Sequence, residues 1–204
     1  MLRQRHGAQT IFFSDDLFTL DREWMYELLH LLQGLAVPIT WGCATRVDLV
    51  DDHLLSAMAG AGCRSIQYGI ESGSQKILDS VKGIQKGQAL KAVKAAKGAG
   101  MKVSSSFMIP FPEDTGETLS ESIEFMEELH REGSRILLSY TTPYPGTYFY
   151  QQADALGIKI LAEGWEEFDA KHNIMETKYL SGEEIEGFVN TLKQKLHHIR
   201  PYFY

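Results

Sequence analysis

The chain has 204 residues, of which 44% are hydrophobic and 23% are charged. This composition is typical of a folded globular domain and excludes a disordered, collagen-like or disulfide-rich chain. The formal net charge is −7 and no block of Lys or Arg occurs, which argues against sequence-independent binding of nucleic acid. No apolar run reaches the roughly 20 residues of a membrane span, and the first ten residues lack a signal-peptide core. We therefore expect a cytoplasmic protein that does not enter a membrane.

Short apolar or β-branched runs alternate along the chain with longer stretches of helical spacing, which is the pattern of βα units. The strands are expected at residues 11–14, 39–42, 65–69, 102–109 and 135–141. The helices are expected at residues 22–34, 51–60, 86–98, 116–133 and 182–198. In the first helix the predicted buried stripe consists of Trp24, Leu28, Leu31 and Leu32. The pattern predicts an α/β fold with five parallel strands in sequential order.

The two ends of the chain differ from this repeat. The opening MLRQRHGAQT has the pattern of the last turns of a helix, stopped at Gly7 and followed by a strand. We therefore expect a first strand and most of its helix to be missing, which leaves 11–14 as an open sheet edge. Residues 1–150 are expected to form this partial barrel. Residues 151–204, with an aromatic and acidic stretch, are expected to form a helical extension on the same domain.

Charged side chains follow the predicted strands, where parallel βα units collect their functional residues. Asp15, Asp16 and Glu71 suit a ligand with an amine and a ribose diol. The alternative is that these carboxylates cap turns and tie down the loop after residue 70. Arg46 and Lys82 suit an acidic group on the ligand.

Two of these residues also have simpler alternative roles. Arg46 would pair with Asp48 or Asp15, and Lys82 would be a solvated surface charge. The two cysteines, Cys43 and Cys63, lie too far apart in sequence for a clustered metal site, so no metal ligand is assigned. We expect both to be small buried apolar groups.

Several strand-end segments together resemble one known family. IFFSDDLFTL, WGCATRVDLV, IQYGIESGSQKIL, residues 108–119 and TTPYPGTYFY occur in the order found in radical S-adenosylmethionine enzymes. The resemblance is closest to the branch with an N-terminal cobalamin-binding domain. It implies a partial, TIM-like (βα)6 barrel in which S-adenosylmethionine lies across the strand ends, bound to a [4Fe–4S] cluster.

The resemblance also implies roles for individual residues. Asp15 and Asp16 correspond to the acidic segment that holds the methionyl amine. Glu71, with Ser72 beside it, corresponds to the polar position that contacts the ribose. Lys82 aligns with a basic position that meets the methionyl carboxylate, and Arg46 faces cofactor or substrate.

Two departures from the family pattern stand out. The Gly-x-Pro-Gly-Glu-Thr turn is replaced by Pro-Phe-Pro-Glu-Asp-Thr at 110–115, and the Cys-x-x-x-Cys-x-x-Cys cluster loop is absent. The resemblance thus predicts an N-terminally truncated piece of an enzyme that cleaves S-adenosylmethionine for methyl transfer or rearrangement of a small molecule, with cobalamin as a further cofactor. We expect this chain alone to be inactive, and the whole enzyme to draw electrons from ferredoxin or flavodoxin. No catalytic residue is assigned.

Two other functions remain open at this point. The first is a non-catalytic binding or partner module derived from the same barrel, which the replaced turn favours. The second is an unrelated barrel enzyme of phosphate or sugar metabolism. That enzyme would need a late phosphate-binding glycine loop, which the sequence lacks.

Overall fold

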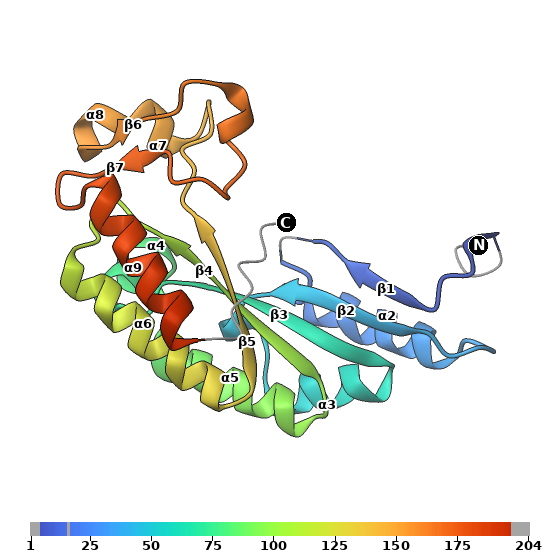
Figure 1. The fold of residues 1–204 in the computed structure, drawn as a ribbon. Coiled ribbons are helices and arrows are strands. Elements are labelled where there is room, and N and C mark those ends of the chain that lie inside the picture. Colours follow the sequence, from blue (N-terminus) through green and yellow to red (C-terminus); the bar gives the residue numbers. More distant parts are fainter. Residues whose placement is uncertain (1–4, 16, 197–204) are drawn as a thin grey trace. The chain divides into compact units, whose positions relative to one another are not determined.

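One sheet organises the protein, whose computed structural model describes residues 5–15 and 17–196 (Figure 1). Its strands are β1 (Thr10–Phe13), β2 (Thr40–Thr45), β3 (Cys63–Glu71), β4 (Lys102–Ile109) and β5 (Ser134–Tyr140). They lie side by side in the order β1-β2-β3-β4-β5. Because a helical crossover joins each strand to the next, the strands run parallel, as the β1–β2 and β2–β3 ladders show. The predicted α/β sheet is confirmed, and β1 lies at its edge.

The helices follow the predicted order with three short additions. They are α2 (Arg22–Gln33), α3 (Asp52–Gly60), α4 (Gln75–Val81), α5 (Lys86–Gly98), α6 (Gly116–Arg131), α7 (Tyr148–Gln151), α8 (Ala153–Leu156) and α9 (Gly182–Lys195). Short 3-10 turns occur at η1 (Val47–Leu49) and η2 (Trp165–Glu167), and β6 (Lys159–Ile160) pairs antiparallel with β7 (Met175–Glu176). The additional helices are α4, α7 and α8, which have seven, four and four residues. They are too short to show a helical period in the sequence, and in α4 only Ile77 and Leu78 are fully buried.

The chain divides into two compact units. Unit 1 comprises residues 1–70, 84–105 and 132–135, and unit 2 comprises 71–83, 106–131 and 136–204. Strands β3, β4 and β5 therefore each contribute residues to both units. The sequence-based boundary after residue 150 stays a prediction.

In unit 1 the core forms around β2 and the helices that flank it. The Trp41 indole N–H donates to the carbonyl of Ala61 over 2.8 Å, which satisfies the polar atom of a fully buried side chain. Asp51 caps α3, because its carboxylate accepts the N–H of Leu54.

The predicted buried stripe of α2 is wrong in phase. Met25 and Leu29 are the buried residues of this helix, whereas Trp24 and Leu31 are exposed. Apolar side chains occupy adjacent positions along the helix, so several neighbouring faces have similar hydrophobicity. The packing partners, rather than the pattern, select the face that is buried.

Unit 2 contains α4, α6 and α9 together with the β6–β7 pair. Helix α9 begins with a capping box between Ser181 and Glu184 and buries Ile185, Val189 and Leu192. It packs on α6, and Lys195 forms a 3.4 Å ion pair with Glu127 of that helix. In the part of the chain that the structure describes, no helix combines the length and apolarity that a membrane crossing requires.

At the start of the described chain the structure agrees with the sequence. Arg5 and His6 are helical, and Gly7 follows with φ +65°, the left-handed conformation in which helices commonly end. The earlier residues of this predicted helix, 1–4, lie outside the described residues.

Candidate functional site

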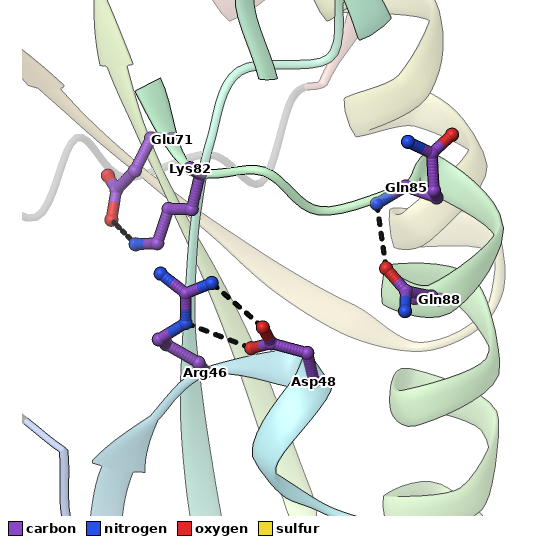
Figure 2. A network of polar contacts seen from close by, with 6 residues as sticks. All are labelled: Arg46, Asp48, Glu71, Lys82, Gln85 and Gln88. Atoms are coloured by element: carbon purple, nitrogen blue, oxygen red, sulfur yellow. Dashed lines mark hydrogen bonds and ion pairs between the residues drawn. The ribbon is translucent and has the colours of Figure 1, made fainter. Parts of the chain in front are cut away.

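The end of β3 carries a charged pair that belongs entirely to unit 2. Glu71 Oε1 lies 2.7 Å from Lys82 Nζ, and the two side chains are only 20% and 17% exposed (Figure 2). Glu71 also has a φ of +77°, a left-handed conformation that is unusual for a residue with a β-carbon. Strained backbone of this kind clusters at functional sites and persists only where its surroundings enforce it. Glu71 is therefore the best-supported site residue of the described chain.

The surroundings of Glu71 come from the loop that follows it. The Gly73 N–H donates to Ser122 Oγ of α6 over 2.9 Å, and the Ser72 and Ser122 hydroxyls lie 3.3 Å apart. A β-carbon at Gly73 would lie 2.5 Å from Ser122 Cα, which is closer than real contacts allow. Gly73 is thus required for packing on α6.

Two hydroxyls that the sequence did not single out are buried in unit 2. Ser74 Oγ and Thr141 Oγ1 have no hydrogen-bond partner among the described residues. A buried polar atom without a partner costs stability, so such an atom calls for a ligand or water. Nothing in the residue types distinguishes these two hydroxyls from others at strand ends. Their burial alone identifies them.

The turn at 110–115, which follows β4 and replaces the family's glycine turn, is closed by Asp114, a residue of the turn itself. The buried Asp114 carboxylate accepts the N–H of Phe111 over 2.7 Å and the hydroxyl of Thr118 over 2.6 Å. Burial raises the pKa of Asp114 above its ordinary value, despite these two donors. Asp114 therefore stabilises the start of α6.

The candidate residues of unit 1 have local partners. Arg46 donates twice to Asp48, over 2.9 and 2.8 Å, as one of the alternatives predicted (Figure 2). The hydrogen bond to Asp48 raises the pKa of Arg46, which keeps the guanidinium charged. The Asp15 carboxylate accepts the N–H of Leu17 over 3.2 Å and so closes a turn. Asp16 lies outside the described residues.

Lys82 is not the solvated surface charge that the simpler alternative predicted, because its side chain is mostly buried and contacts Glu71. Ser72 uses its hydroxyl within the loop, where it also accepts the N–H of Ser74. Asp15 and Arg46 belong to unit 1, whereas Glu71, Ser72 and Lys82 belong to unit 2. That all of them line one shared cleft stays a prediction.

The two cysteines do not fit an iron–sulfur cluster. Cys43 and Cys63 are both fully buried, and such clusters are held by a set of cysteine thiolates that two residues cannot supply. The hydrogen bond to Cys63, together with burial, raises the pKa of the Cys43 thiol, which keeps it in the protonated form that does not ligate metal. In residues 5–15 and 17–196 no group of three His, Cys, Asp or Glu side chains is arranged to hold a metal ion.

A parallel βα sheet with charged residues at its strand ends is the framework of βα-barrel enzymes. Residues 1–126 match the family model described as the Radical SAM superfamily, and the chain belongs to this family.

Several curated relatives are methyltransferases by name, among them the following two. The chain is 31% identical over 186 residues to an uncharacterized methyltransferase of Pyrococcus horikoshii, covering 91% of this chain and 40% of that protein. It is 26% identical over 171 residues to bacteriochlorophyllide d C-8(2)-methyltransferase of Chlorobaculum tepidum, covering 80% of this chain and 36% of that protein. The chain thus spans well under half the length of these relatives.

Solved structures agree on the fold. The radical S-adenosylmethionine methyltransferase TsrM of Kitasatospora setae, solved with cobalamin and a [4Fe–4S] cluster, matches with a TM-score of 0.65 at 15% identity, over 84% of this chain and 36% of that one. Coproporphyrinogen III oxidase of Escherichia coli matches with a TM-score of 0.67 at 13% identity, over 93% of this chain and 40% of that one. At these identities the comparisons establish a shared architecture.

Proposed function

We propose that this chain is the S-adenosylmethionine-binding part of a methyl-transferring radical enzyme that also uses cobalamin. The observation that carries the proposal is Glu71, an acid held in a left-handed conformation at a strand end and paired with Lys82. The names of the similar methyltransferases support the reaction class.

Each residue has a chemical task in this proposal. The Glu71 carboxylate accepts hydrogen bonds from the vicinal hydroxyls of the ribose, and Lys82, which donates to Glu71 Oε1, orients that carboxylate. Ser72 fixes the loop through Ser122, while the free hydroxyls of Ser74 and Thr141 are available to a polar ligand. Asp15 and Asp16 are proposed to hold the methionyl ammonium, and Arg46 to face cofactor or substrate.

Binding of the cofactor can be tested without a cluster. Saturation-transfer NMR with millimolar S-adenosylmethionine detects the transfer of magnetic saturation from protein protons to the ribose protons of a bound ligand. We expect this transfer for the wild-type chain. Glu71→Gln should weaken binding about tenfold or more, because a hydrogen bond to a charged group is worth about 1.5–3 kcal/mol. The matched control is Glu124→Gln, at an exposed acid of α6. Absence of transfer in the wild type, or equal transfer in both variants, contradicts the proposal.

The whole protein is proposed to act on a small molecule in the cytoplasm, with a ferredoxin or flavodoxin as reductant. The bound cluster and cobalamin would supply the redox and methyl-carrier chemistry. Because Cys43 and Cys63 do not fit a cluster, its thiolates would have to come from residues other than these.

A second candidate is a binding module that has no radical chemistry of its own. The Asp114 contacts favour it, since they show that the turn in place of the family's glycines is closed by side chains of this chain. Cofactor binding that persists while a longer version of the protein, carrying the cluster loop, fails to cleave S-adenosylmethionine would support this candidate.

A further inference from the structure

Unit 2 contains a cavity of about 580 Å³ that the proposed cofactor site does not use. Its wall is formed by the end of β5, the segment between β6 and β7, and one face of α9. In Figure 1 helix α9 is red and the β6–β7 region is orange. The volume lies within the range of small-molecule sites. The charged and phenolic residues that line it are Tyr140, Glu163, Glu167, Lys171, Glu186 and Lys193.

One wall of this cavity is fixed by hydrogen bonds. The buried Tyr140 hydroxyl donates to Glu186 Oε1 over 2.7 Å, which orients the carboxylate. Burial, followed by this hydrogen bond, raises the pKa of Tyr140, so the hydroxyl remains a donor. The backbone N–H of Tyr140 donates to the carbonyl of Ala170 over 2.9 Å, which ties the lining segment to the end of β5. Glu186 is therefore held in place before any ligand arrives.

The charges that line the cavity do not neutralise one another. Three are glutamates and two are lysines, and none of the five forms an ion pair with another described residue. Opposite charges in one cavity that remain apart favour a ligand that carries both signs, because each ligand charge then meets its complement.

The spacing along α9 suggests the shape of such a ligand. Glu186 and Lys193 are seven residues apart, so they lie on the same face of the helix, separated by about 10 Å along its axis. A ligand that meets both must be elongated, with its ammonium and its acidic group at opposite ends. The compact zwitterion of glycine is too short for this.

We propose that this cavity binds a small elongated zwitterion, whose ammonium is held by Glu186 and whose carboxylate or phosphate is held by Lys193, with Lys171 as a second positive charge. The proposal does not depend on the cofactor site. It assigns a ligand-binding role to the C-terminal part of the chain.

The test uses a series of amino acids of increasing length. Glycine, 4-aminobutanoate and 6-aminohexanoate are titrated into the full chain by calorimetry, with hexylamine and hexanoate as probes that each lack one charge. We expect affinity to rise with length, and both single-charge probes to bind about tenfold more weakly than 6-aminohexanoate or worse. Failure of every amino acid to bind at millimolar concentration overturns the proposal. So does hexylamine binding as well as 6-aminohexanoate.

Two variants assign the binding to this cavity. Glu186→Gln and Lys193→Gln should each weaken 6-aminohexanoate about tenfold. The control Glu183→Gln, at an exposed acid in the first turn of α9, should not change it. Lys193 is exposed, so its substitution leaves the core intact, and thermal unfolding verifies this. Unchanged affinity in both variants would overturn the assignment.

Discussion

The loop after β3 and the helix α2 reverse the usual relation between polarity and burial. The loop reads Ser72-Gly73-Ser74, yet both serines are buried and the glycine contacts α6. Helix α2 is rich in apolar residues, yet Trp24 is 45% exposed and Leu31 is 68% exposed. The difference teaches that a few hydroxyl hydrogen bonds and one close backbone approach can specify a position more tightly than a broad apolar stripe does.

Gly73→Ala should produce the largest loss of stability. The added β-carbon would lie 2.5 Å from Ser122 Cα and 2.9 Å from Phe125 Cβ, so the backbone of either the loop or α6 must move. We expect a loss of about 3 kcal/mol, the upper part of the range for overpacked cores, measured by urea unfolding.

The matched control for this substitution is Gly187→Ala in the interior of α9. A β-carbon there meets nothing within 4 Å, so the change should stabilise the helix by about 0.5–1 kcal/mol. Changes of opposite sign in the free energy of unfolding for the two substitutions would sharpen the contrast between a packed loop and an open helix face. A neutral Gly73→Ala would show that the loop is not as closely packed as described.

Asp114→Ala should cause the second-largest loss of stability, about 2 kcal/mol in the free energy of unfolding, because the Phe111 N–H loses its buried acceptor. The pH dependence gives a second readout. Burial raises the folded-state pKa of Asp114, so its contribution to stability is full below the unfolded value of about 3.9 and is lost as pH rises through the folded pKa. Relative to Asp114→Asn, the wild type should therefore gain stability as pH falls from 7 toward 4. A pH-independent difference would contradict this burial effect.

These cases indicate how far the sequence alone could go. The five strands were predictable because each is a short β-branched or apolar run bounded by turn residues, although β3 extends beyond the predicted 65–69 to Cys63–Glu71. The pairing of Arg46 with Asp48 was also predictable, since the two are neighbours along the chain.

Other features required three dimensions. The burial of Asp114 depends on where the turn after β4 packs, and the left-handed conformation of Glu71 has no signal in its residue type. The contact between Gly73 and Ser122 joins residues 49 positions apart. For the candidate site, the sequence indicated Glu71 and Lys82 separately, and the structure added that they pair.

The two charged pairs at strand ends should differ in their coupling. A double-mutant cycle on Glu71→Gln and Lys82→Met, measured from the free energies of unfolding, should give a coupling energy of about 1 kcal/mol, near the upper value for partly exposed pairs. The same cycle on Arg46→Met and Asp48→Asn should give about 0.5 kcal/mol. Arg46 and Asp48 are more exposed, and their closeness in sequence lets them meet in the unfolded chain as well. Equal couplings would remove the distinction between the two pairs.

The smallest effect is expected for Leu31→Gln on α2. Because this side chain is 68% exposed, its replacement should change the free energy of unfolding by no more than about 0.5 kcal/mol in urea titrations. Leu29, two positions earlier, is 3% exposed, and the same substitution there should cost several times more, because an amide would be buried without partners. Similar losses at both positions would mean that α2 buries the stripe that the sequence predicts, and that the contrast between this helix and the loop after β3 is smaller than the structure indicates.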